Sequence, residues 1–220
     1  MATKTSTSLN SNKLPWPTLA ALLSVCILGM AALYHGTMGF EVVSTEDGRR
    51  LAISRQALVL PEAAIHAPQA TTLARLLQGD GRITIVTFFY SSCNAVCSVL
   101  GDEFQRMQTT IHQRGLEKQV RLLSISFDPR DDAARLAAYA QRQHADPELW
   151  QMAYIDHQAE RKALLDAFGI VVLPAPLGEF QHNAAFHLIG RDGKLARIDD
   201  YDNPNLALEH AIQMAKRSAP

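Results

Sequence analysis

The sequence predicts an α/β domain built on a largely parallel sheet, preceded by one transmembrane helix. An uncharged apolar run lies near the N-terminus, and β-branched or aromatic runs alternate with helical patterns over the remainder. Such alternation is typical of strands that pair in parallel through helical crossovers. A chain of 220 residues is long enough for one ordinary domain beside the apolar run.

Composition excludes several classes of protein. The net charge is -1, from 21 basic and 22 acidic residues, which argues against a nucleic-acid partner because such a partner requires a basic surface. Hydrophobic residues make up 47% of the chain, as in globular proteins. The three cysteines are too few for a small disulfide scaffold.

The N-terminal part is predicted to anchor the protein in a membrane. We expect a cytoplasmic tail over residues 1–15, a transmembrane anchor over 16–35 and a linker over 36–48. The anchor is uncharged, has roughly the 20 residues that an apolar helix needs to cross a bilayer, and has Trp16 and Tyr34 near its ends. Because the lysines of the tail precede it, we expect a single-pass protein of the inner membrane with its domain in the periplasm. The alternatives are a cleaved signal peptide and a buried core helix.

Residues 49–220 are expected to form the soluble domain. Asp131 and Asp132 suit a helix start, Gly169 suits a helix end, and Asp192-Gly193 suits a hairpin turn. Strands are expected at 82–90, 120–127, 150–155, 186–189 and 195–198, with short candidates at 49–53 and 58–60, and helices at 96–114, 131–144, 158–168 and 204–216. This order predicts a thioredoxin-like architecture with an antiparallel hairpin at one edge.

Cys93 and Cys97 lie where a buried strand is expected to lead into a helix. Backbone N–H groups and the helix dipole at such a position favour the thiolate, which is both a nucleophile and a metal ligand. Residues four apart on a helix have Cβ atoms about 5–6 Å apart, whereas a disulfide needs about 3.5–4.5 Å. The spacing therefore favours a metal, while a redox dithiol and a merely structural pair stay open. Cys26, within the anchor, is expected to be inert.

The sequence contains eight histidines, each a candidate for a third metal ligand beside the two cysteines. His182 differs from the others because it precedes the hairpin strand, whose start should face the cysteine helix. Two thiolates with one imidazole suit copper, as Cu(I) or Cu(II). Zinc is a weaker interpretation because its structural sites usually have four protein ligands, and a thiol peroxidase is weaker still.

Four segments of the sequence resemble the Sco/SenC copper proteins of cytochrome oxidase assembly, over about residues 80–215. They are FFYSSCNAVC, SISFDPRDD, LLDAFGI and HNAAFHLIGRDG. The resemblance implies that Cys93, Cys97 and His182 are the copper ligands, with His187 a less favoured alternative to His182. Asp128 matches a family aspartate, which is either a helix cap or a residue with a redox or docking role.

The sequence departs from the family pattern around the ligands, which identifies a divergent member. The family usually has proline after each cysteine, where this chain has Asn94 and Ser98. It usually has aspartate before and serine after the histidine, where this chain has Gln181 and Asn183. The ligand types are kept, but their surroundings differ, which bears on affinity and target.

The resemblance implies a membrane-anchored copper chaperone that delivers copper to, or matures the copper site of, a respiratory cytochrome oxidase. Its partner would be an oxidase subunit or another copper-binding protein. The alternative is a thioredoxin-like thiol-disulfide reductase that uses Cys93 and Cys97 as a redox dithiol to keep target cysteines reduced. Whether the protein is an enzyme stays open at this point.

Overall fold

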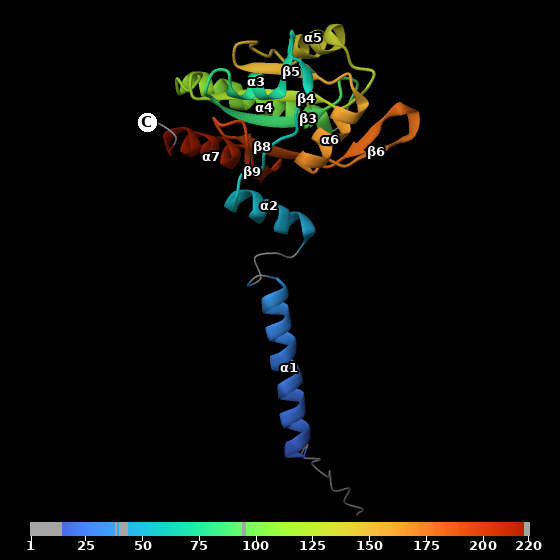
Figure 1. The fold of residues 1–220 in the computed structure, drawn as a ribbon, viewed down its shortest axis with the longest axis vertical. Coiled ribbons are helices and arrows are strands. Elements are labelled where there is room, and N and C mark those ends of the chain that lie inside the picture. The colour runs from blue at the N-terminus through green and yellow to red at the C-terminus, as the bar shows by residue number, and fades with distance from the viewer. Residues whose placement is uncertain (1–14, 38, 40–43, 94–95, 218–220) are drawn as a thin grey trace, which may run out of the picture. The chain divides into compact units, whose positions relative to one another are not determined.

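The protein is described by a computed structural model that covers residues 15–37, 39, 44–93 and 96–217, without the side chains of 96–99. The chain divides into two compact units, Met1–Leu51 and Ala52–Pro220 (Figure 1). The cytoplasmic tail predicted over 1–15 lies almost entirely outside the described residues.

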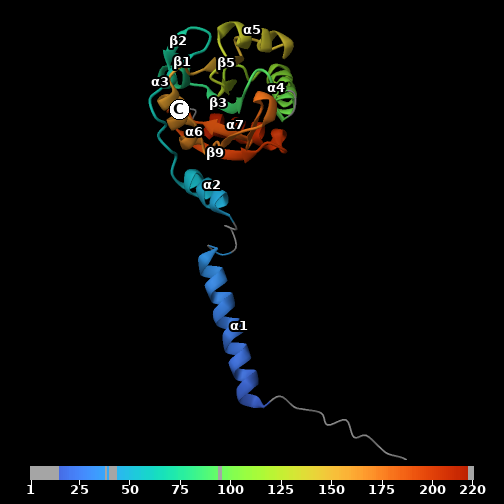
Figure 2. The same cartoon turned by 90° about the vertical axis from the view of Figure 1, so that its right-hand side faces the viewer.

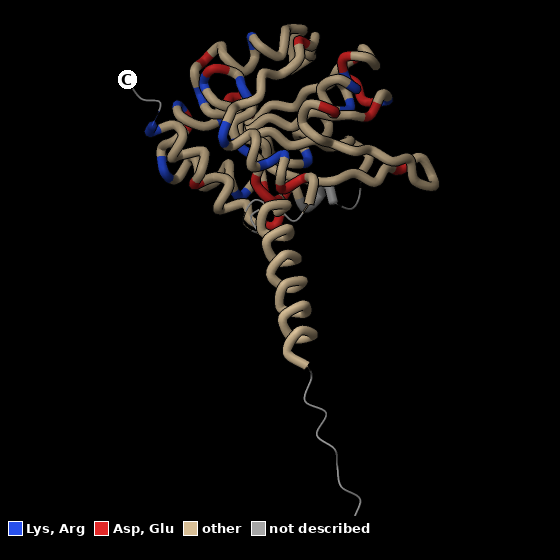
Figure 3. Tube along the Cα trace, turned by 60° about the horizontal axis from the view of Figure 1, so that its bottom comes forward, with Lys and Arg blue, Asp and Glu red and all other residues tan. Residues whose placement is uncertain are grey.

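The first unit contains α1 (Trp16–Gly36), which has no charged residue and no buried side chain. Figure 3 shows this helix without a basic or acidic position, whereas both kinds are spread over the second unit. Among the described residues, α1 is the one helix long and apolar enough to cross a membrane. The predicted transmembrane helix is therefore present as a candidate span.

Helix α2 (Thr45–Arg55) corrects two expectations. Residues 49–53 are helical, so the strand expected there is wrong, and the predicted linker 36–48 is helical from Thr45. The helix begins with reciprocal hydrogen bonds between Ser44 and Asp47: Ser44 N–H donates to Asp47 Oδ2, and Asp47 N–H donates to Ser44 Oγ. Such a capping box stabilises a helix start that hydrophobic periodicity does not reveal.

The second unit alternates strands and helices in the order that the sequence predicts, with additional short elements. Its strands are β1 (Ala64–His66), β2 (Ala70–Thr72), β3 (Ile83–Phe89), β4 (Val120–Ser126), β5 (Trp150–Tyr154), β6 (Val172–Pro174), β7 (Phe180–His182), β8 (Ala185–Ile189) and β9 (Leu195–Asp200). Its helices are α3 (Leu73–Gln78), α4 (Val96–Gln113), α5 (Ala133–Arg142), α6 (Gln158–Phe168), the 3-10 turn η1 (Pro176–Gly178) and α7 (Pro204–Arg217).

Seven strands form one sheet in the order β2-β1-β5-β4-β3-β8-β9. The central strands β5, β4 and β3 are parallel, and β8 and β9 extend the sheet as an antiparallel hairpin. β1 and β2 form a second antiparallel pair at the other edge, and β6 and β7 form a separate two-stranded sheet. Figure 2 shows β2 and α3 at one side of this unit and α4 at the other. The predicted parallel sheet with an edge hairpin is thus confirmed.

Helices cover both faces of the sheet. Successive residues of β3 point to opposite faces, so this strand contacts helices on both sides. Phe89 packs against Tyr139 of α5 with ring centroids 4.6 Å apart, whereas Phe88 packs against Phe168 of α6 at 5.0 Å. All seven residues of β3 and all seven of β4 are buried. The strand that leads to Cys93 is therefore fixed by packing on both faces.

Glycine has a local role at two positions of the domain, at a helix end and at a close approach between segments. Gly169 ends α6 with φ 69°, the left-handed conformation that favours glycine, as predicted. Gly101 lets α4 approach Gln143, because a Cβ at this position would lie 2.7 Å from Gln143 Oε1.

Of the strand expected at 58–60, only Leu58 is paired, in an isolated bridge with Leu195.

Candidate metal and thiol site

Cys93 lies in the loop between β3 and α4, at the carboxyl edge of the parallel strands. Its N–H donates to the Tyr90 carbonyl oxygen at 3.2 Å, and its side chain is half-buried. α4 begins at Val96, so the backbone of Cys97 belongs to the first turn of the helix. The side chain of Cys97 lies outside the described part of the chain, and the predicted pairing of the two sulfurs stays a prediction.

Asp131 holds the cysteine loop in place. This buried carboxylate accepts hydrogen bonds from Ser91 N–H at 2.9 Å, from Ser91 Oγ and from Ser126 Oγ at 2.5 Å. Ser126 ends β4, and Asp131 precedes α5, so one side chain joins three segments of the chain. The sequence indicated Asp131 only as a helix start, because its partner Ser91 is 40 residues away.

His182 is the last residue of β7 in the β6–β7 hairpin, a pair of strands that the sequence did not predict. It pairs with Val172 across the hairpin. The next residue, Asn183, ties the base of the hairpin to the end of α6: its Oδ1 accepts from Val171 N–H at 2.7 Å and its Nδ2 donates to the Gly169 carbonyl at 2.8 Å. The asparagine that departs from the family pattern thus positions the neighbouring histidine.

Aromatic rings surround His182. The imidazole packs edge-on against Phe127, with centroids 4.9 Å apart, and lies 6.4 Å from the Tyr90 ring. The Tyr90 hydroxyl donates to Glu179 Oε2 at 2.6 Å. Burial and this hydrogen bond to a carboxylate, together with a hydrogen bond to Cys93, raise the pKa of Tyr90 well above its usual value. Tyr90 therefore stays a neutral phenol that touches both the cysteine loop and the hairpin.

Cys93 and His182 both lie beside Tyr90, and their role as joint metal ligands stays a prediction. Burial lowers the pKa of His182, while the Asn183 carbonyl and the negative charge of Cys93 act in the opposite direction. Nδ1 of His182 lies 2.9 Å from the Asn183 carbonyl oxygen. If Nδ1 carries the proton and donates it to that oxygen, Nε2 is the nitrogen with the lone pair that a metal requires.

Asp128 is not the cap of α5, so that interpretation is wrong. Asp132 caps the helix through a hydrogen bond from Arg135 N–H. Asp128 is buried and pairs with Arg130, whose Nη2 contacts Asp128 Oδ2 at 2.7 Å and donates to the Gly178 carbonyl at 2.8 Å. Asp128 and Arg130 therefore tether the outer end of the β6–β7 hairpin.

His187 is a strand residue and not part of this site. It is 1% exposed within β8, and its Nε2 lies 3.2 Å from the Phe168 carbonyl oxygen. His112 and His210 contact carboxylates elsewhere on the domain, His112 through Glu117 and His210 through Asp199. Cys26 lies in α1 and is exposed.

Among the described side chains, no group of three histidine, cysteine or carboxylate residues is placed to hold a metal ion. Cys97, which would complete the predicted set, lies outside that search because its side chain is not described. The chemistry of the donors nevertheless fits a soft metal, since Cys93 supplies a thiol and His182 an imidazole kept neutral by burial.

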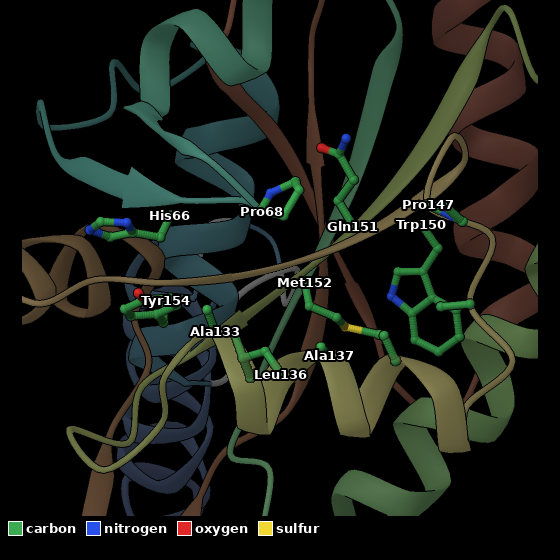
Figure 4. A pocket seen from close by; sticks show the side chains of 12 residues that line it. His66, Pro68, Ala133, Leu136, Ala137, Pro147, Trp150, Gln151, Met152 and Tyr154 are labelled. Carbon is green, nitrogen blue, oxygen red and sulfur yellow. The ribbon is translucent and has the colours of Figure 1, made fainter.

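A separate apolar cavity of about 140 Å³ lies between α5 and β5. Figure 4 shows Trp150 and Met152 pointing toward α5, with Ala137 on the facing helix, and His66 beside Tyr154. His66 stacks on Tyr154 at 4.7 Å and pairs through Nε2 with Asp156 at 2.9 Å. Among the described residues that line it, the cavity brings together no nucleophile or group of metal ligands.

Comparisons with known protein sequences found relatives of this chain. A family model described as SCO1/SenC matches residues 71–217. The SCO1 protein homolog of Bacillus subtilis is 25% identical over 125 residues, which is 56% of this chain and 63% of that protein's length.

Solved structures give the same fold. Yeast Sco1 with copper bound has a TM-score of 0.61 at 17% identity, over 74% of this chain and 91% of its own. BsSco, described with a disulfide switch and as a member of the Sco family of cytochrome c oxidase assembly proteins, has a TM-score of 0.61 at 18% identity, over 73% and 95%. The predicted α/β, thioredoxin-like fold class is confirmed. Because the family model covers most of the chain, from the short β2 strand to the end of α7, this protein belongs to the SCO1/SenC family.

Proposed function

We propose that this protein is a membrane-anchored copper carrier that binds copper through Cys93, Cys97 and His182 and passes it to a respiratory cytochrome oxidase. The observation that carries the proposal is the meeting of Cys93, on a loop fixed by Asp131, with His182, on the β6–β7 hairpin. The two residues are far apart in the sequence, and the contacts of both with Tyr90 support a shared site.

The donor set supports copper as the cargo. Thiolates favour Cu(I), and an imidazole nitrogen allows Cu(II) as well. Burial lowers the pKa of His182, so the ring is neutral at neutral pH and its lone pair is available to a metal. The rings of Phe127 and Tyr90 pack around the histidine and exclude water from one side.

The relatives support the same cargo and destination. Yeast Sco1 holds copper, and BsSco belongs to the oxidase assembly proteins. We infer from these relatives that this chain shares their cargo, with a cytochrome oxidase subunit or another copper-binding protein as its partner.

We further propose that α1 is an uncleaved inner-membrane anchor with the domain in the periplasm. Its length and lack of charge support membrane insertion, and the lysines that precede it in the sequence support this orientation. Fractionation of cells that produce the full chain tests the anchor. Recovery of the full chain in the soluble periplasmic fraction, or a mature N-terminus beyond residue 30, would contradict it.

The copper site is tested by titrating the full, reduced chain in detergent with Cu(I) and Cu(II). We expect one copper ion per chain, no binding after Cys93→Ser or Cys97→Ser, and weaker binding with a changed Cu(II) spectrum after His182→Ala. His157→Ala is the matched control, because His157 is exposed and its side chain does not cap α6. Unchanged binding and an unchanged spectrum in the His182 variant would reject the ligand set.

The competing function is a thiol-disulfide reductase, for which both cysteines are also required. His182→Ala separates the two functions, because thiol exchange needs an attacking and a resolving thiol and no imidazole ligand. We expect this variant to keep most thiol exchange with a model peptide yet to fail in oxidase assembly at limiting copper. Normal oxidase activity in that variant under copper limitation would reject the carrier and favour the reductase.

A further inference from the structure

Cys93 faces two different surroundings. On one side lie Tyr90 and the aromatic cluster around His182. On the other lies an open pocket of about 640 Å³ between the cysteine loop and α5. We define this basic pocket by Cys93, Arg135, Arg142 and Gln143, four of the residues that line it.

The basic pocket carries two positive charges beside the thiol. Arg135 and Arg142 are exposed, and among the described residues neither forms an ion pair and no carboxylate lines the pocket. Arg142 is partly positioned, because its Nη2 donates to the Ser91 carbonyl at 3.2 Å and its guanidinium lies 5.5 Å from the centroid of the Tyr139 ring. The net charge of the whole chain is only -1, so this pair is a local feature.

The spacing of the arginines fits an extended acidic segment. Residues seven apart on a helix lie on one face, about 10 Å apart along its axis. Two carboxylates three residues apart on an extended chain of the polyproline II type, which has three residues per turn, lie on one side of the chain and about 9 Å apart. A cysteine between these carboxylates would then lie near Cys93.

We propose that the basic pocket docks the protein partner of Cys93 through an acidic, cysteine-containing segment whose carboxylates pair with Arg135 and Arg142. This inference rests on the proposed function, in which Cys93 is a copper ligand that releases its copper to a partner protein. Charge complementarity beside the thiol raises the encounter rate and selects partners, more than it adds to final affinity.

The test uses Cys93 as the only thiol, in the full chain carrying Cys26→Ala and Cys97→Ser. Three peptides of the sequence Glu-Cys-Ala-Glu, Gln-Cys-Ala-Gln and Lys-Cys-Ala-Lys, blocked at both ends, are supplied as mixed disulfides with 2-thiopyridine. The Cys93 thiolate attacks the peptide sulfur, the peptide-pyridyl disulfide breaks, and pyridine-2-thione leaves and is measured by its absorbance. The readout is the ratio of rate constants between acidic and neutral peptides.

We expect the acidic peptide to react at least fivefold faster than the neutral one at low salt and the basic peptide to react slowest, with the differences shrinking as salt rises. Arg135→Gln with Arg142→Gln should bring the acidic-to-neutral ratio within about twofold. Arg135→Gln alone should give an intermediate ratio. Because the Arg135 side chain is exposed and forms no hydrogen bond within the described part of the chain, this variant guards against misfolding of the double variant. If the arginines act only on the reactivity of the Cys93 thiolate, the double variant will react more slowly with all three peptides by the same factor. The acidic-to-neutral ratio of rate constants would then be unchanged, and this result would overturn the proposal.

The matched control removes two charges elsewhere on the domain, through Arg106→Gln and Arg114→Gln, and should keep the ratio of the parent chain. Equal rates for the three peptides in the parent chain, or equal loss of preference in the control, would overturn the acidic partner. Copper titration of the arginine variants, with both cysteines restored, reports on the proposed function separately. A chain that binds no copper yet keeps the arginine-dependent ratio would reject the copper carrier and retain the acidic partner.

Discussion

The two segments that meet at the candidate site are held by the domain in different ways. The loop of Ser91 to Cys93 follows β3, all of whose residues are buried, and Asp131 fastens it from within the domain. The β6–β7 hairpin has no fully buried strand residue, and it is held at its base and tip by single side chains. Cys93 therefore belongs to a part of the site that is fixed by buried packing, whereas His182 belongs to a hairpin that is held through a few side-chain contacts.

The largest expected effect is on the free energy of unfolding, when the buried carboxylate that holds the cysteine loop is removed. Asp131→Ala leaves Ser91 and Ser126 without their buried acceptor, and we expect a loss of about 3 kcal/mol in the free energy of unfolding. Asp132→Ala, which removes only the N-cap of α5, should cost about 1 kcal/mol. Urea unfolding of the full chain in detergent compares the two. Equal losses in both variants would show that Asp131 acts only as part of the helix start.

A smaller effect is expected where the two segments touch. Tyr90→Phe removes the hydroxyl that donates to Glu179, and we expect a loss of about 1.5 kcal/mol, because this buried donor meets a carboxylate. Glu179→Gln and the double variant complete a double-mutant cycle. A coupling energy near zero would contradict a link between the cysteine strand and the hairpin through this pair.

Removing the support at the hairpin base should affect the site more than the fold. Asn183→Ala loses the hydrogen bonds to Val171 and Gly169, and because Asn183 is exposed we expect a loss of only about 1 kcal/mol in unfolding free energy. Copper affinity should fall by at least tenfold, since His182 is the neighbouring residue. Hydrogen exchange at the Val171 amide provides the structural readout, and unchanged exchange would contradict the role of Asn183.

The smallest expected effect is at the tip of the hairpin, and it has the opposite sign. Leu177 is fully exposed and has φ 63°, a conformation that costs a residue with a side chain about 1–2 kcal/mol. Leu177→Gly removes this cost, although glycine loses about 0.5–1 kcal/mol more through the entropy of the unfolded chain. We expect a net gain of about 0.5 kcal/mol, measured by urea unfolding, with Leu173→Gly as a control that should not gain stability.

The parts predictable from the sequence are those with local or strongly periodic signals. The strands β3 and β4 were predicted because they are apolar on both faces, and the end of α6 because Gly169 marks it. Cys93 and His182 were predicted as joint ligands from their places relative to these strands; both lie beside Tyr90, and the ligand pair itself stays a prediction.

The missed parts depend on contacts that leave little trace in a single sequence. β6 and β7 have three residues each, and β6 ends in proline, so neither shows a strand pattern. The role of Asp131 depends on a serine 40 residues away, and Arg130 reaches a carbonyl 48 residues away. The basic pocket was missed for the same reason, since only the fold brings α5 beside the cysteine loop.

Gly101 has a consequence for how partner choice could evolve in this protein. The atoms that an added Cβ would meet belong to the end of the flexible Gln143 side chain, which also lines the basic pocket. A change from glycine to alanine would therefore be tolerated by the backbone of α4 and accommodated by moving Gln143. One added methyl group would in this way change the shape of the basic pocket beside Cys93 and so alter which partners fit. Because α4 contributes neither arginine, both positive charges and the candidate ligands would stay the same.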